Sequence, residues 1–190
     1  MARVQDGSAI PLGDGFSVAA ITGTIAAALA QDSALFVARL SPTATESAYV
    51  DWLKLRWTTL IAFTTPITAG RQLALYRGSG AAASGGTAIA AAAESADFPP
   101  VSFFNATPGG DMRIATTGAL TVAGITFETA PQERVTLSHV GAAGAFYETL
   151  LVPRIPILIA PGELIAIRNP VAMDAAGTFQ LGVTMGWSER

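Results

Sequence analysis

The sequence predicts an all-β protein, a jelly-roll-like antiparallel β-sandwich with an extended N-terminal arm. Three observations lead to this fold. Short segments of alternating apolar and polar residues recur along the chain, as expected for half-buried strands. The 11 prolines and 19 glycines lie mainly between these segments, where turns are expected. Helical periodicity is weak everywhere except in 20–31. The secondary structure of this segment is left undecided, because its alanines favour a helix and its β-branched residues favour a strand.

The strand pattern is clearest at the C-terminal end of the chain. Five apolar residues occupy every second position there, and the residues between them are small or polar. The apolar residues of this segment are Phe179, Leu181, Val183, Met185 and Trp187. Further strands are expected in the segments 33–40, 47–63, 71–78, 111–117, 133–140, 146–152, 155–160 and 162–169. Many short strands separated by turns favour two packed sheets.

The chain divides into an arm, residues 1–32, and one sandwich domain, residues 33–190. The arm lacks clean alternation, and 158 remaining residues (190 minus 32) suffice for a single domain. A domain of this size buries roughly 70% of the surface of its unfolded chain. The low-complexity stretch 78–97 is expected to be a loop followed by a short strand around 87–92, with a flexible linker as the alternative.

Charged residues are sparse, at 13% of the chain with a formal net charge of −3. About a quarter is usual for a soluble domain. The low value fits a protein that covers much of its surface with other subunits, and it fits a compositional bias toward alanine equally well. No basic cluster indicates a nucleic-acid partner. The apolar segment 16–30 is too short and too interrupted by Thr and Gly to cross a bilayer, and the residues before it lack the basic start of a signal peptide.

Little in the sequence indicates catalysis. The chain has no cysteine and one histidine, which excludes the usual zinc sites built from several nitrogen and sulfur ligands. His139 is expected on the same face of a strand as Val135 and Leu137, in a structural role. No nucleophile elbow, phosphate-binding loop or calcium loop accompanies the serines and acids, and the aspartates stand singly in turn-like contexts. We therefore expect no enzymatic activity and no cofactor.

The segment 47–57 contains the candidate binding residues. Its alternation assigns Leu53, Leu55 and Trp57 to the core face. The opposite face then carries Trp52, Lys54 and Arg56, with Tyr76 extending the patch from the strand expected next to it. Aromatic residues and arginine are enriched in protein interfaces, so we expect a protein–protein contact here. The alternative is a solvated face on which Trp52 stacks under Arg56.

Two stretches of the chain resemble small virion proteins of tailed bacteriophages. In the first, a strand of the type L-x-W-x-x-x-x-F-T precedes a G-x-x-L-x-L-Y strand and a G-G-T turn. The matching residues are Leu55, Trp57, Phe63, Leu73, Leu75, Tyr76, Gly85, Gly86 and Thr87. The second stretch follows the pattern E-x-L-x-I-R-N…A-x-G-T…W-x-E, through Glu163, Ile167, Arg168, Asn169, Gly177, Thr178, Trp187 and Glu189. Together they cover about 40% of the sequence.

The resemblance implies a capsid decoration, or cement, protein with a jelly-roll-like sandwich. Such a protein would bind the major capsid protein where capsomers meet, would form a homotrimer, and would clamp its neighbours with the arm. It would be made in the host cytoplasm and would end on the capsid surface of the virion. No site residue carries over, because the shared motifs are fold motifs. The alternative is a carbohydrate- or receptor-binding module of a tail or fibre.

Overall fold

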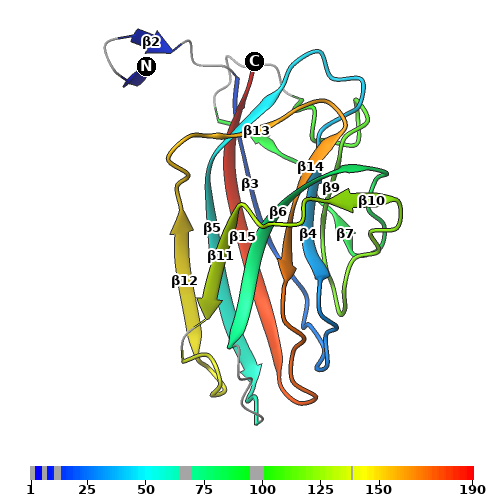
Figure 1. Ribbon diagram of the computed structural model, residues 1–190, viewed down its shortest axis with the longest axis vertical. Coiled ribbons are helices and arrows are strands. Elements are labelled where there is room, and N and C mark those ends of the chain that lie inside the picture. The colour runs from blue at the N-terminus through cyan, green and yellow to red at the C-terminus, as the bar shows by residue number, and fades with distance from the viewer. Residues whose placement is uncertain (1–2, 6–7, 11–13, 65–69, 95–100, 138) are drawn as a thin grey trace.

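The computed structural model describes residues 3–5, 8–10, 14–64, 70–94, 101–137 and 139–190. In these ranges the protein has no helix, and two antiparallel sheets pack against each other as a β-sandwich (Figure 1). The sequence-based prediction of an all-β sandwich is therefore confirmed. No helix in the described residues is long and apolar enough to cross a membrane.

One layer, called here the β5 sheet, has the strand order β12-β5-β15-β3-β8, and β13 also pairs with β5. All of its pairs are antiparallel, and β15 lies between β3 and β5 over most of its length. The bounds of its strands are β3 (Asp14–Ile21), β5 (Ala48–Ile61), β8 (Ala92–Ala93), β12 (Phe146–Leu151), β13 (Ile157–Ile159) and β15 (Thr178–Glu189).

The other layer, the β6 sheet, has the order β10-β6-β14-β4-β9-β7, and β11 also pairs with β6. Its strands are β4 (Ser33–Arg39), β6 (Arg71–Gly80), β7 (Thr87–Ala88), β9 (Asp111–Ile114), β10 (Ile125–Phe127), β11 (Glu133–Leu137) and β14 (Glu163–Asn169). A separate hairpin is formed by β1 (Arg3–Gln5) and β2 (Ser8–Ile10), which pair with each other.

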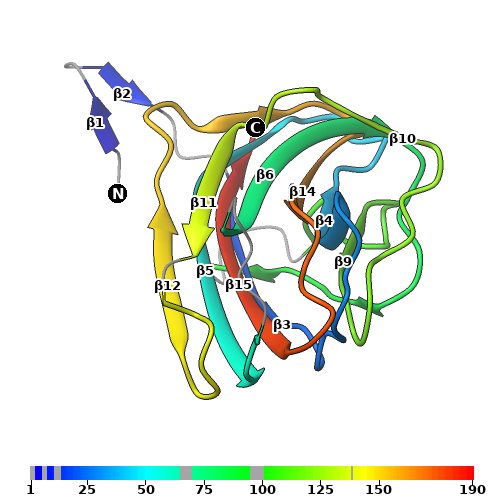
Figure 2. The same ribbon diagram turned by 60° about the horizontal axis from the view of Figure 1, so that its bottom comes forward.

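The pairing order is that of a jelly roll. Eight strands form the two quartets β3-β15-β5-β12 and β4-β14-β6-β11, so that strands consecutive in the chain, such as β3 and β4 or β5 and β6, lie in opposite layers. Two interlocked quartets of this kind define the jelly roll. Figure 2 shows the quartets β12-β5-β15-β3 and β11-β6-β14-β4 in their two layers. The connection from β6 to β9 adds β7 to the edge of one layer and β8 to the edge of the other. The stretch 78–94 thus contains two short strands, where one was expected, and 95–97 lie outside the described residues.

The sandwich begins earlier than the sequence indicates. The expected arm, residues 1–32, includes β3, which pairs with β15 over its whole length and contributes Phe16 and Val18 to the core. The boundary placed at residue 32 is therefore wrong. Among the described residues, only the β1–β2 hairpin precedes the sandwich, and the open segment 20–31 contains the end of β3 and irregular chain.

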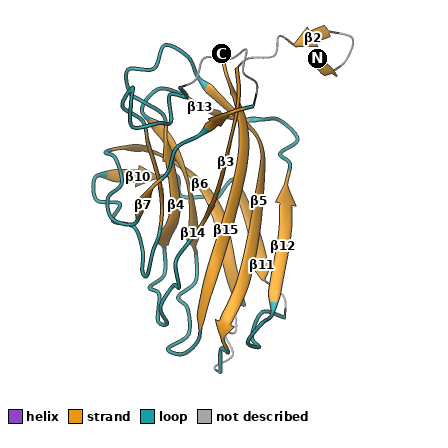
Figure 3. Ribbon diagram, turned by 180° about the vertical axis from the view of Figure 1, so that it is seen from behind, coloured by secondary structure: helices purple, strands orange, loops and turns teal. Residues whose placement is uncertain are grey.

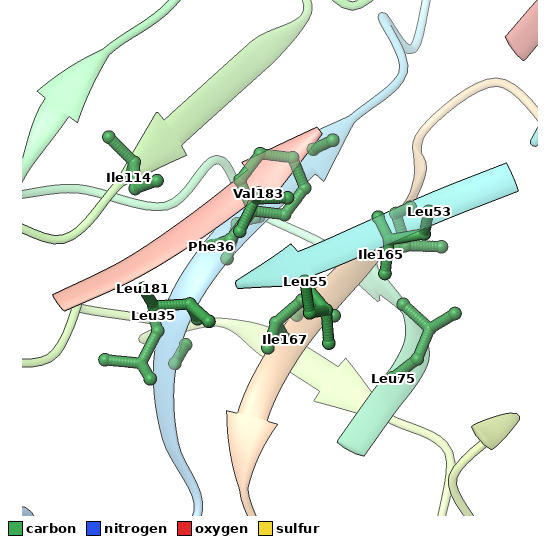
Figure 4. Packing of buried hydrophobic residues seen from close by; sticks show 14 of the residues in the cluster. Leu35, Phe36, Leu53, Leu55, Leu75, Ile114, Ile165, Ile167, Leu181 and Val183 are labelled. Carbon is green, nitrogen blue, oxygen red and sulfur yellow. The ribbon is translucent and has the colours of Figure 1, made fainter. Parts of the chain in front are cut away.

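Side chains from both layers interdigitate in a single core (Figure 4). Leu53 and Leu55 of β5 meet Ile165 and Ile167 of β14, and every one of these is at least 97% buried. Trp57 stacks on Phe179 with ring centroids 3.7 Å apart. Burying a large apolar side chain contributes about 1.5–3 kcal/mol, so this core supplies the main stabilisation of the fold.

Candidate interaction surface

The outer face of β5 is set by its long pairing with β15. Leu53, Leu55 and Trp57 are buried, as the alternation predicts. The register shifts between Gly186 and Trp187, where Trp52 and Val50 are the successive partners, so Asp51 is the extra residue of a β-bulge. The bulge keeps Val50 and Leu53 on the core side although three positions separate them. Trp52, Lys54 and Arg56 consequently share the outer face of the β5 sheet. Figure 3 shows the strands β3, β15, β5 and β12 of this sheet side by side.

Trp52 is half-buried because its ring lies across the neighbouring strand. A Cβ atom added to Gly186 of β15 would come within 2.4 Å of the indole nitrogen of Trp52. Gly186 therefore provides the space that the ring occupies. The indole is held flat against the sheet, and it does not stand free as an exposed anchor would.

Lys54 and Arg56 flank a carboxylate on the edge strand. The ammonium of Lys54 lies 2.9 Å from Glu148 of β12, with both side chains more than 40% exposed. Arg56 is exposed and lies directly opposite Glu148 in the β5–β12 register. An ion pair as exposed as this one contributes at most about 1 kcal/mol to stability. Its greater effect is to neutralise the carboxylate in the middle of β12.

Tyr76 does not belong to this face, which corrects the expectation that it extends the patch. It lies on β6, and β6 is in the other layer. Its side chain is buried on the outer side of the β6 sheet, edge-on to Phe127, with the guanidinium of Arg168 over both rings at 4.9 and 4.2 Å from their centroids. Tyr76 therefore stabilises the outer face of the β6 sheet through packing and cation–π contacts.

The residues that extend the patch lie instead on β12, which sequence reasoning missed. Phe146 is 69% and Leu150 58% exposed, and both share the outer face with Trp52. After β12, Val152, Ile155 and Leu158 are each more than 40% exposed, and the first two also line the cleft behind β12. The available signal was the segment 146–152, whose two alternating faces both carry apolar residues. One face of β12 packs against the core, and no element among the described residues packs on the other face.

A cleft opens behind β12, where the edges of the two layers separate. Its volume is 360 Å³, and it lies between the β12–β13 region of one layer and β6 and β11 of the other. Apolar side chains dominate its lining, and Glu133 is its one ionisable residue among those described. The lining residues are Val50, Leu53, Leu75, Gln132, Glu133, Leu150, Leu151, Val152, Pro153, Ile155 and Ile157.

His139 is not on the strand face where the sequence places it. Strand β11 ends at Leu137, and His139 is an exposed residue of the following turn with φ of 56°. The left-handed backbone ends the alternation that carries Val135 and Leu137 into the core. Among the described residues, no three His, Asp or Glu side chains come together in an arrangement that could hold a metal ion.

The structure thus brings together Trp52, Lys54 and Arg56, excludes Tyr76 from their face, and adds the exposed residues of β12. We call this combined surface, formed by Trp52, Lys54, Arg56, Phe146, Glu148 and Leu150, the β5–β12 face. It combines aromatic and arginine side chains with exposed aliphatic ones, a composition typical of protein interfaces. No family model matches the chain, and neither a curated protein nor a solved structure matches it.

Proposed function

We propose that the chain is a structural virion protein that decorates a bacteriophage capsid and stabilises it by bridging neighbouring capsid subunits. The observation that carries the proposal is the β5–β12 face, where the exposed Phe146 and Leu150 flank Glu148 opposite Arg56 and Lys54. Contiguous exposed apolar surface usually marks a binding site. The resemblance of two stretches of the sequence to phage virion proteins supports the choice of partner.

The proposed mechanism is the repeated burial of modest interfaces. A standard protein–protein contact removes on the order of 1,600 Å² from water. A subunit that touches two capsid proteins at once gains avidity, because its second contact forms at high effective concentration. Many such bridges over one shell make the particle more resistant to heat than any single contact would.

The test uses capsids that lack the decorating protein, mixed with purified chain. Arg56→Glu reverses a charge in the β5–β12 face and leaves the Trp52–Gly186 packing untouched. The matched control is Arg134→Glu, which changes an exposed arginine on β11 of the other layer. We expect the occupancy of capsids to fall at least tenfold for Arg56→Glu, and to stay unchanged for the control.

A second variant, Trp52→Ala with Phe146→Ala, removes the aromatic part of the face, with circular dichroism reporting whether the sandwich is retained. Normal occupancy by both face variants would refute the proposed contact. Binding to a glycan array that depends on Phe146, with no binding to capsids, would assign the chain to the alternative class of tail or fibre modules.

A further inference from the structure

Strand β12 differs from the other sheet edges of the sandwich. The β5 sheet ends on its far side at β8 and the β6 sheet at β7, and each of these strands has two residues. Strand β11 shares the remaining edge with the three-residue β10 and exposes Glu133, Arg134 and Thr136, and the three-residue β13 follows β12 along β5. Short or charged edges are the usual means of preventing strands from pairing with other chains. Strand β12 has six residues and neither proline nor lysine, and the charge of Glu148 is neutralised by Lys54.

The free side of β12 offers a regular row of backbone groups. The amide of Thr59 donates to the carbonyl of Ala145 at 2.8 Å, which fixes the residues whose backbone faces β5. Hydrogen-bonded pairs alternate along an antiparallel ladder, so the N–H and C=O groups of Phe146, Glu148 and Leu150 point away from β5. The side chains of these three residues also project from the outer face.

We propose that β12 pairs antiparallel with the β12 of a second copy about a two-fold axis at Glu148. This register places Phe146 opposite Leu150 of the second copy, and the reverse, giving two aromatic–aliphatic pairs. The two Glu148 carboxylates meet at the axis, and Lys54 and Arg56 of both copies surround them with four positive charges. That excess of positive charge offsets the repulsion between the carboxylates.

The exposed apolar area agrees with a weak dimer. Phe146, Leu150 and Val152 are between 58% and 69% exposed. At about 100 Å² for each fully exposed side chain, they offer on the order of 200 Å² per copy. Apolar atoms make up roughly 60% of an interface, so the contact would bury about 300 Å² per copy. The total of about 600 Å² is below the standard size of an interface, so the association should be weak and reversible.

This contact is isologous and closes at two copies. It therefore favours a dimer over the trimer that the sequence resemblance implies. The inference does not rest on the proposed capsid partner, but both contacts use Phe146 and Leu150, so the second copy and the capsid compete for the same face. The mass of the purified chain tests the dimer, and the occupancy of capsids tests the proposed function.

Cross-linking tests the pairing and its register, because the natural chain contains no cysteine. Residues on a two-fold axis in a hydrogen-bonded antiparallel pair have Cα atoms about 5.5 Å apart, within the range of a disulfide. Glu148→Cys should give a disulfide-linked dimer under mild oxidation. The matched control, Leu150→Cys, faces Phe146 of the second copy and should stay monomeric on a denaturing gel. Cross-linking of Leu150→Cys in place of Glu148→Cys would overturn the register.

Sedimentation equilibrium tests the dimerisation of the chain without an introduced cysteine. The unaltered chain should show reversible association to twice its 19.5 kDa mass, with a dissociation constant in the micromolar range or above. Leu150→Lys should raise that constant at least tenfold, whereas Ala19→Lys, on the same outer face but on the distant strand β3, should not change it. A monomer at all concentrations, a trimer, or an unaffected Leu150→Lys variant would overturn the proposal.

Discussion

The indole ring of Trp52 occupies the space above Gly186, so that even one added carbon at position 186 would meet the ring nitrogen at 2.4 Å. Gly182 lies four residues earlier on the same face of β15, and its surroundings differ. A Cβ atom there would lie 3.5 Å from Arg56, an ordinary van der Waals distance. The two glycines face the same side of one strand, but only one of them is required by its neighbour.

Gly186→Ala should therefore force the ring of Trp52 off the sheet. We expect the free energy of unfolding to fall by about 1–3 kcal/mol, the usual cost of overpacking, as measured by urea denaturation. Trp57 and Trp187 are buried, so a rise in the fraction of tryptophan fluorescence that acrylamide quenches would report on Trp52 alone. Gly182→Ala is the control and should be neutral or slightly stabilising, since glycine in a strand costs about 0.5–1 kcal/mol relative to alanine. Equal effects of both substitutions would contradict the packing described.

A buried ion pair fixes the loop before β15. Asp174 accepts a hydrogen bond from Arg71, its side chain has no exposure, and the guanidinium of Arg71 lies over the ring of Phe63 at 4.3 Å. Asp174→Ala removes the charge that faces a largely buried guanidinium and should cost about 3–5 kcal/mol of unfolding free energy. Glu148→Ala breaks the exposed pair with Lys54 and should cost less than about 1 kcal/mol. Thermal and urea denaturation of both variants would test this contrast, which a similar loss in each would disprove.

Truncation tests where the sandwich begins. A chain that starts at residue 13 retains β3, so its melting temperature should match that of the full chain within a few degrees. A chain that starts at residue 22 lacks Phe16, which stacks on Trp187 at 5.9 Å, and leaves β15 without one of its two partner strands. We expect this shorter chain to unfold or aggregate, as seen by circular dichroism and light scattering. A stable fold in the shorter chain would show that β3 is dispensable, as an arm would be.

Local pattern was enough to predict the fold class and the faces of the long strands. The alternation in β5 and β15 is strict because one face of each is entirely buried, and the buried sets Leu53, Leu55 and Trp57 in β5 and Phe179 to Trp187 in β15 follow it. Strand β3 was missed because its outer positions are Gly15, Ser17 and Ala19, whose small side chains give little contrast with the core residues between them.

The candidate site was predicted only in part, because its membership depends on which strands are neighbours. Tyr76 is close to Trp52 in the sequence, but β5 and β6 enter different layers, and alternation carries no information about that choice. The same holds for β12. Its pattern shows two apolar faces, but only the strand order shows that the strand ends a sheet. Edge position is a property of long-range pairing and has no local signature in the segment 146–152.

The link between β6 and β9 has a mechanical consequence. Strand β7 pairs in one layer and β8 in the other, so this connection holds the two layers together along that side of the sandwich. Along the opposite side, β11 and β12 end their layers without a shared strand, and the 360 Å³ cleft already separates them. The two layers should therefore begin to separate there, and a partner that binds β12 should oppose this separation.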